Sequence, residues 1–134
     1  MSFSTEVKCE AAALPMKKTC CRRALIAGVL VGGGKCCDDE IALQLDNAAA
    51  ALCARLVREQ FGRECEPQPI GKRGFLLTFV SKSAAALMQD SAANPSVLIR
   101  CPECAAALVR GVFLGGGTIS APRNYYHLEL GSRA

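Results

Sequence analysis

One stretch of the sequence occurs twice, and this repeat constrains the fold more than any other feature. The first copy runs from Cys21 to Lys35 and the second from Cys104 to Thr118. The copies align without a gap, 83 residues apart, and 8 of their 15 positions are identical. Internal repetition predicts two copies of one structural unit. We therefore expect two equivalent helices, each ended by glycines.

Small residues fall four apart within each copy. They are Ala24, Gly28 and Gly32 in the first copy, and Ala107, Gly111 and Gly115 in the second. Residues four apart share a helix face, so each helix carries a stripe almost free of side chains. A glycine inside a helix costs about 1 kcal/mol relative to alanine, and close approach of a second backbone would offset that cost. We expect the two stripes to form a helix-pair interface; the alternative is two ordinary buried helices.

This pair resembles the helices of the LAGLIDADG homing endonucleases, with the nine family positions on residues 26–34 and 109–117. In that family an acidic residue at the eighth position of each helix binds the catalytic metal. Here these positions are Gly33 and Gly116, and glycine has no side-chain oxygen to hold Mg²⁺. The resemblance therefore implies the family's scaffold with no catalytic residue, a protein that is not an enzyme; a residual nuclease is the alternative.

The remaining residues predict an α+β fold, with an N-terminal helix before one full αββαββα-type repeat. The first helix is expected over Met1–Leu14, with Ser4 as its N-cap. A hairpin of residues 35–37 and 41–46 follows the first striped helix. Asn47 is then expected to cap an amphipathic helix over residues 48–61, with Ala49 on its exposed side.

A second hairpin is expected over residues 64–70 and 75–80, and Ser81 then caps a helix that ends at Gln89. After the second striped helix, residues 119–121 and 125–130 predict a third hairpin. The domain organisation expected is one truncated LAGLIDADG-like domain, residues 1–134. Residues 1–90 form the N-terminal helix and first repeat, 91–100 a linker, and 101–134 the opening helix and hairpin of a second repeat.

A second resemblance covers nearly the whole chain. Its motifs are the opening eight residues, Cys20-Cys21, Asn47-Ala-Ala with Phe61-Gly62, and Gly111–Gly117 followed by Tyr126–Leu130. Together these resemble the N-terminal part of the WhiA family, bacterial regulators of sporulation and cell division. Members carry a degenerate LAGLIDADG domain followed by a DNA-binding helix-turn-helix domain, and these 134 residues contain no such C-terminal domain.

The WhiA resemblance implies a non-catalytic regulatory or interaction domain of a DNA-binding transcriptional regulator of sporulation, cell division and chromosome segregation. DNA binding is expected only through the absent C-terminal domain, and a protein partner is expected for this one. The longest strongly apolar run, residues 24–31, is far short of a membrane span. We expect a cytoplasmic protein, nucleoid-associated at full length.

The nine cysteines fit reduced thiols better than a disulfide framework, because their number is odd and their spacing irregular. Four of them, Cys20, Cys21, Cys101 and Cys104, stand at the starts of the two copies. If the helices pair in parallel, these thiols converge and could hold Zn²⁺. Against a metal, the first pair is Cys-Cys and not Cys-x-x-Cys, and adjacent cysteines rarely ligate one metal together. The Cys101-Pro-Glu-Cys104 spacing is a departure from the WhiA family, in which adjacent cysteines like Cys20-Cys21 are common. We expect reduced thiols and no cofactor or metal; a metal or redox site is the alternative.

A weak DNA-binding module, using the sheet face and basic turns, is the second function considered. The net charge of +4 permits nucleic-acid binding without requiring it. The candidate phosphate contacts are Lys72, Arg73 and Arg123, all at turns. Four of the nine strand residues expected to face away from the core are acidic. These nine are Gln44, Asp46, Glu64, Glu66, Gln68, Thr78, Tyr125, His127 and Glu129.

An incomplete second repeat also predicts self-association. The flank of the second striped helix and the apolar side of the third hairpin would lack cover, and such surfaces associate readily. Two copies could pair their third hairpins or exchange the segment after Asn94.

Overall fold

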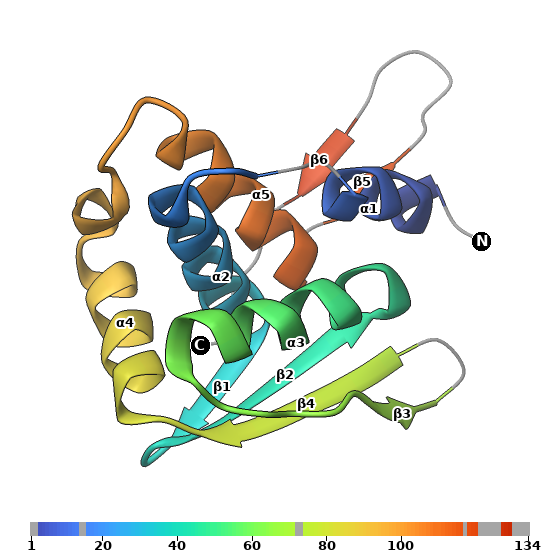
Figure 1. Ribbon diagram of the computed structural model, residues 1–134. Coiled ribbons are helices and arrows are strands. Elements are labelled where there is room, and N and C mark those ends of the chain that lie inside the picture. Colours follow the sequence, from blue (N-terminus) through green and yellow to red (C-terminus); the bar gives the residue numbers. More distant parts are fainter. Residues whose placement is uncertain (1–2, 14–15, 72–73, 117, 121–126, 130–134) are drawn as a thin grey trace.

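The computed structural model describes residues 3–13, 16–71, 74–116, 118–120 and 127–129. Within them, a four-stranded antiparallel sheet lies against a layer of helices (Figure 1). The strands are β1 (Gly34–Cys37), β2 (Glu40–Asp46), β3 (Gln68–Ile70) and β4 (Gly74–Val80), in the order β1-β2-β4-β3. The α+β, LAGLIDADG-like order of helix, hairpin, helix, hairpin and helix is confirmed.

Four helices contact strand β2 and so cover one face of the sheet. They are α2 (Thr19–Gly33), α3 (Asn47–Phe61), α4 (Lys82–Ala93) and α5 (Cys104–Gly116). The N-terminal helix α1 (Phe3–Ala13) packs beside α3 and α5.

The first hairpin follows directly from the alternation in its sequence. Ile41, Leu43 and Leu45 are buried against the helices, while the residues between them are exposed or half-buried. Asp38 lies in the turn with a φ of 54°, a left-handed conformation that aspartate tolerates better than most residues. Pairing of Gly34 with Leu43 brings the end of helix α2 directly into the sheet.

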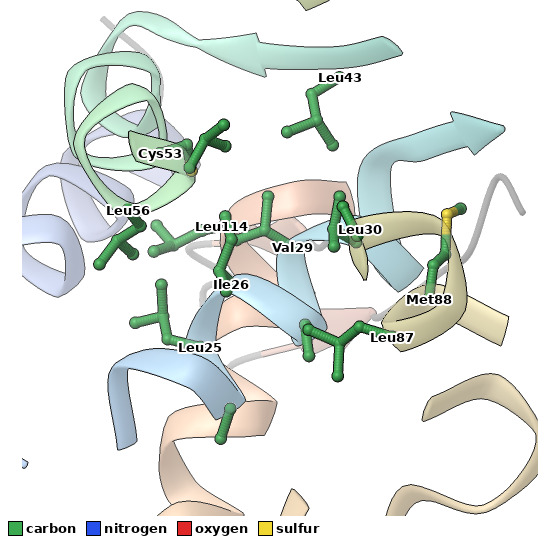
Figure 2. Packing of buried hydrophobic residues seen from close by; sticks show 14 of the residues in the cluster. Leu25, Ile26, Val29, Leu30, Leu43, Cys53, Leu56, Leu87, Met88 and Leu114 are labelled. Carbon is green, nitrogen blue, oxygen red and sulfur yellow. The ribbon is translucent and has the colours of Figure 1, made fainter. Parts of the chain in front are cut away.

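Helix α2 is the centre of the core. Ten of its 15 residues are buried, because other elements surround it on several sides. Figure 2 shows its side chains among Cys53 and Leu56 of α3, Leu43 of β2, and Leu87 and Met88 of α4. A stacked pair, Phe61 and Phe79, with ring centres 6.2 Å apart, joins the end of α3 to β4. Burial of this kind stabilises the fold by about 25 cal/mol per Å² of apolar surface.

The helix ends match the sequence expectations in part. Ser81 caps α4, since its Oγ accepts a hydrogen bond of 3.1 Å from the backbone N–H of Ala84. Gly62 ends α3 with a φ of 66°. The other two capping assignments are wrong: Asn47 is the first residue of α3 rather than its cap, and Ser4 lies inside α1.

The expected exposure of Ala49 is also wrong, since this side chain is fully buried. The run of four alanines at residues 48–51 contains no contrast between polar and apolar side chains. It therefore could not show which side of α3 faces the core. The structure places Ala49 and Ala50 inside and Ala51 at the surface.

Residues 91–100, expected as a linker, are largely structured. Helix α4 continues past Gln89 to Ala93. It ends at Asn94, whose backbone is not helical (φ −150°, ψ 87°) and which precedes Pro95, a position where proline disfavours helix. A 3₁₀ helix, η1 (Pro95–Leu98), follows, and Leu98 is buried in the core.

The chain beyond α5 forms a separate two-stranded antiparallel sheet from β5 (Thr118–Ser120) and β6 (His127–Glu129). The predicted third hairpin is thus present in the described residues, although Tyr125, Tyr126 and Leu130 lie outside them. Across the described part of the chain, no helix is long and apolar enough to cross a bilayer.

Candidate functional site

Helices α2 and α5 form a parallel pair, the most extensive contact between elements in the described part of the chain. Their backbones touch at the glycines. A Cβ added to Gly28 would meet the carbonyl oxygen of Leu108, and one added to Gly111 would meet that of Leu25. Further along the same stripes, a Cβ on Gly115 would lie 2.6 Å from the carbonyl oxygen of Val29. Side chains at these positions would force the helices apart.

The remaining stripe residues lie in the same interface region. A Cβ on Gly32 would lie 2.7 Å from the carbonyl oxygen of Val112. Ala24 and Ala107 are both buried. All six stripe residues therefore occupy places where a larger side chain has little or no room.

The positions that are acidic in LAGLIDADG nucleases lie at the ends of the two helices. Gly33 is buried, and a Cβ on it would meet the backbone carbonyl of Gly115. Gly116, the equivalent residue of α5, is half-buried. Neither position supplies an oxygen ligand, and at Gly33 the space for a carboxylate is already filled by the other helix.

At the opposite end of the pair, the four cysteines converge. The Sγ atoms of Cys20, Cys21, Cys101 and Cys104 all lie within 4.8 Å of one another. The Sγ of Cys101 is 3.5 Å from that of Cys21 and 3.5 Å from that of Cys104. Cys21 and Cys104 are buried, whereas Cys20 and Cys101 are half-buried. We call these four thiols the cysteine cluster.

Two local features bring the cysteine cluster together. Cα–Cβ bonds in a helix tilt toward its N-terminus, so the side chains of Cys20 and Cys21, in the first turn of α2, lean over the start of that helix. The segment 101–104 forms a turn in which the N–H of Cys104 donates to the carbonyl oxygen of Cys101 at 3.1 Å. Because α2 and α5 run in parallel, both starts meet at one place.

The charges beside the cluster form a short chain of contacts. The ammonium group of Lys18 lies 2.7 Å from a carboxylate oxygen of Glu103, and the thiol of Cys101 donates to the same oxygen at 3.1 Å. The Lys18 contacts lower the pKa of Glu103 to about 2. The hydrogen bond to Glu103, together with burial, raises the pKa of Cys101 to about 12.

Cys104 behaves differently from its neighbours. Burial alone would raise the pKa of its thiol, but hydrogen bonds from the backbone of Arg100 and Cys101 and from the thiols of Cys101 and Cys20 lower the pKa to about 7. Burial raises the pKa of Cys21. One thiol of the cluster is therefore predisposed to deprotonate near neutral pH, which metal ligation requires.

A surface groove adjoins the cluster. It is lined by the thiol-bearing Cys21, by Met16, Lys17, Lys18 and Glu103, and by Ala106, Ala107 and Arg110 of α5. Of the four cysteines, Cys21 lines this groove.

The candidate DNA contacts Lys72, Arg73 and Arg123 lie outside the described residues. On the sheet face opposite the helices, the alternation places Lys35 and Glu40 beside uncharged residues such as Thr78. Asp46, expected on that face, instead forms an ion pair of 3.4 Å with Lys8 of α1. His127 lies in β6, opposite Ser120. The described part of this face carries no basic stripe.

Two charged residues with partners far away in the sequence were missed in the sequence analysis. Glu103, paired with Lys18, controls the electrostatics of Cys101, and its place inside the Cys-Pro-Glu-Cys turn is the signal that could have revealed it. Lys8 is buried between Asp46 and Phe113, whose ring centre lies 5.6 Å from the ammonium nitrogen. In the sequence, the available signal is the position of Lys8 one helical turn before the apolar Ala11 and Ala12.

The paired helices, with their glycine contact and the sheet beside them, define a LAGLIDADG-like domain. A family model described as "WhiA LAGLIDADG-like domain" matches residues 105–134. The sequence is 30% identical over 155 aligned residues to the "Probable cell division protein WhiA" of Syntrophomonas wolfei, covering 97% of this chain and 49% of that protein. The same-named protein of Heliobacterium modesticaldum is 29% identical, with 97% and 48% covered.

Solved structures agree with the sequence matches. Full-length DUF199/WhiA from Thermatoga maritima superposes with a TM-score of 0.64 at 23% identity, covering 97% of this chain and 44% of that one. The N-terminal LAGLIDADG domain of DUF199/WhiA gives a TM-score of 0.67, also at 23% identity, covering 96% and 66%. The chain is thus similar to WhiA LAGLIDADG-like proteins along almost all of its length, and it spans about half the length of the curated relatives it matches.

Proposed function

We propose that this chain is a non-catalytic regulatory and interaction domain of a bacterial DNA-binding regulator of sporulation, cell division and chromosome segregation. Its relatives are named probable cell division proteins. Sequence-specific DNA binding would belong to a helix-turn-helix domain outside these 134 residues. The protein would act in the cytoplasm, associated with the nucleoid at full length, and this domain would contact a protein partner.

The observation that carries the non-catalytic part of the proposal is the packing at Gly33. A metal-dependent nuclease needs carboxylate oxygens at the ends of the paired helices. At Gly33 the carbonyl of Gly115 occupies the space where a side chain would begin. The glycines at these two helix ends support a helix pair that packs the domain together and does not hold a catalytic metal.

The assignment of DNA binding to another domain rests on the charge of the sheet face. Affinity for DNA depends on lysine and arginine side chains that meet phosphates. In the described strands Lys35 pairs with Ala42, and Glu40 pairs with Cys37 and Val80, so the described part of this face has no basic stripe.

Two assays test the proposal. Plasmid DNA incubated with the protein and Mg²⁺ or Mn²⁺ should stay supercoiled, and nicking that copurifies with the protein would overturn the non-catalytic assignment. A gel-shift series at increasing salt should show no retention of duplex DNA at physiological ionic strength. Retention that weakens steeply with salt would support the alternative, a weak DNA-binding module.

A further inference from the structure

We propose that Cys20, Cys21, Cys101 and Cys104 form a tetrathiolate site for one Zn²⁺ ion, which fastens the start of helix α2 to the start of helix α5. The site is independent of the regulatory role, since it would exist whatever the domain binds. Among the described residues, these four are the group of metal-ligating side chains that lies close enough to hold an ion.

The sulfur geometry suits a single ion. Four thiolates at a Zn–S distance of about 2.3 Å in a tetrahedron place their sulfurs about 3.8 Å apart. The observed separations include two of 3.5 Å, and all six are within 4.8 Å. The sulfur atoms would have to shift by a few tenths of an ångström to about 1 Å to complete the tetrahedron. Rotation of the cysteine side chains is enough for such shifts. An iron–sulfur cluster would need more room, because bridging sulfides separate its ligands.

The adjacency of Cys20 and Cys21 is the main objection, and the structure answers it. Both residues stand in the first turn of α2, where side chains lean toward the helix start. Cys101 and Cys104 reach the same point from another segment, in the Cys-x-x-Cys spacing common in zinc sites. Structural zinc is commonly held by two pairs of ligands from two separate segments. Here the two segments are some 80 residues apart in sequence, as for Cys21 and Cys101.

Positive charge near the site would compensate the negative charge of the zinc-bound thiolates. Binding converts four thiols into four thiolates, releases a proton from each protonated one, and leaves a centre of net charge −2. The N-termini of two helices point toward it, and Lys18 lies beside it. The negative charge of Glu103 opposes the charge of the zinc centre. Lys18 partly neutralises that carboxylate, and because the Glu103 side chain is well exposed it can rotate away from the thiolates.

The first test is metal loading of the whole chain, reduced and freed of metal beforehand. Zn²⁺ titrated against a chromophoric chelator should bind with one ion per chain, and Co²⁺ should give the intense d–d and sulfur-to-metal absorption of a tetrahedral thiolate site. Cys20→Ser and Cys101→Ser should each weaken Zn²⁺ binding by more than the roughly 10–100-fold that loss of an outer-shell contact costs. These two thiols are half-buried, so the variants should still fold, which circular dichroism verifies.

Cys9→Ser and Cys37→Ser are the matched controls, since both remove an exposed cysteine outside the cluster and should leave binding unchanged. Alkylation followed by mass spectrometry gives a second readout. Zn²⁺ should protect Cys20 and Cys101 while Cys9 and Cys37 stay reactive. Absence of stoichiometric binding, an octahedral Co²⁺ spectrum, or binding that the control substitutions weaken equally would overturn the proposal. So would a disulfide forming within the cluster in air while reduced protein takes up no metal.

Discussion

Gly28 and Gly111 face each other across the α2–α5 crossing with no side chain between them. A Cβ on Gly111 would lie 3.0 Å from the Cα of Gly28, and a Cβ on Gly28 would lie 3.0 Å from the carbonyl carbon of Gly111. A Cβ on Gly28 would also come closer than 3.0 Å to the carbonyl oxygen of Leu108, and one on Gly111 closer than 3.0 Å to that of Leu25. Real Cβ atoms essentially never come that close to another atom, so any substitution must move a backbone. The pairing of the two repeats therefore depends on glycine at these positions.

The first prediction is that replacing Gly28 lowers the stability of the protein instead of raising it. Gly28→Ala should destabilise the protein by about 1–3 kcal/mol, because the new methyl group overpacks the crossing. Helix propensity alone predicts the opposite, a gain of up to about 1 kcal/mol. Urea unfolding measures the difference. The control is Ala51→Leu, which adds bulk on the exposed side of α3 and should change stability by no more than about 0.5 kcal/mol. Stabilisation by Gly28→Ala would show that the helices do not touch there.

The second prediction concerns the lost nuclease chemistry. Restoring an acidic residue with Gly33→Asp should not restore cleavage, because the carboxylate would meet the carbonyl of Gly115. The variant should instead unfold at a lower temperature than the parent, and Gly33→Ala separates the steric part of that loss from the charge. Mg²⁺-dependent nicking by Gly33→Asp, with unchanged thermal stability, would contradict this account of the site.

The third prediction follows from Glu103 and applies to the proposed zinc site. Zn²⁺ competes with protons for the thiols, so its apparent affinity should rise with pH. The Glu103 hydrogen bond holds the pKa of Cys101 at about 12 and therefore opposes ligation. Removing the carboxylate charge with Glu103→Gln should lower that pKa and shift the whole binding profile toward lower pH. Zn²⁺ affinity measured between pH 6 and 8 checks the shift, and a shift toward higher pH would contradict the assigned role of Glu103.

Glu64→Gln is a control for that experiment. Glu64 is exposed and lies 3.9 Å from Arg58 in an ion pair unrelated to the cluster. This substitution makes the same change of net charge, so it reports any general electrostatic effect. The profile of the Glu64 variant should coincide with that of the parent.

Much of the fold was predictable because its signals are local. The alternation of Ile41, Leu43 and Leu45 fixes the buried face of β2, and Gly62 ends α3 through its left-handed conformation. The repeated glycines identify both central helices. The wrong predictions fell where the sequence has no local signal. The run of alanines at residues 48–51 does not show which side of α3 faces the core, and nothing before Asn94 marks the end of α4.

The cysteine cluster was predictable only in part. The repeat makes Cys21 and Cys104 equivalent, which puts two thiols at the same end of a parallel pair. Whether Cys20 and Cys101 join them depends on the path of residues 94–103 and on helix geometry, which spacing does not encode. Glu103 acts on Cys101 through a direct hydrogen bond, which its place in the Cys-Pro-Glu-Cys turn could have suggested. Its pairing with Lys18, 85 residues away in sequence, needed the structure.

The last prediction concerns self-association through the outer face of α5. Ala105, Ala106 and Val109 are exposed on that face, and half of the Val109 surface is accessible to solvent. Exposed apolar faces of this kind associate readily, so we expect a concentration-dependent dimer in sedimentation or light scattering. Val109→Lys should weaken the dimer, because it would bury a charge in the contact. Val97→Lys is the matched control, since Val97 is similarly exposed but lies in η1. A monomer at the highest soluble concentration would contradict association, and equal weakening by both substitutions would place the contact elsewhere, as in an exchange of the segment after Asn94.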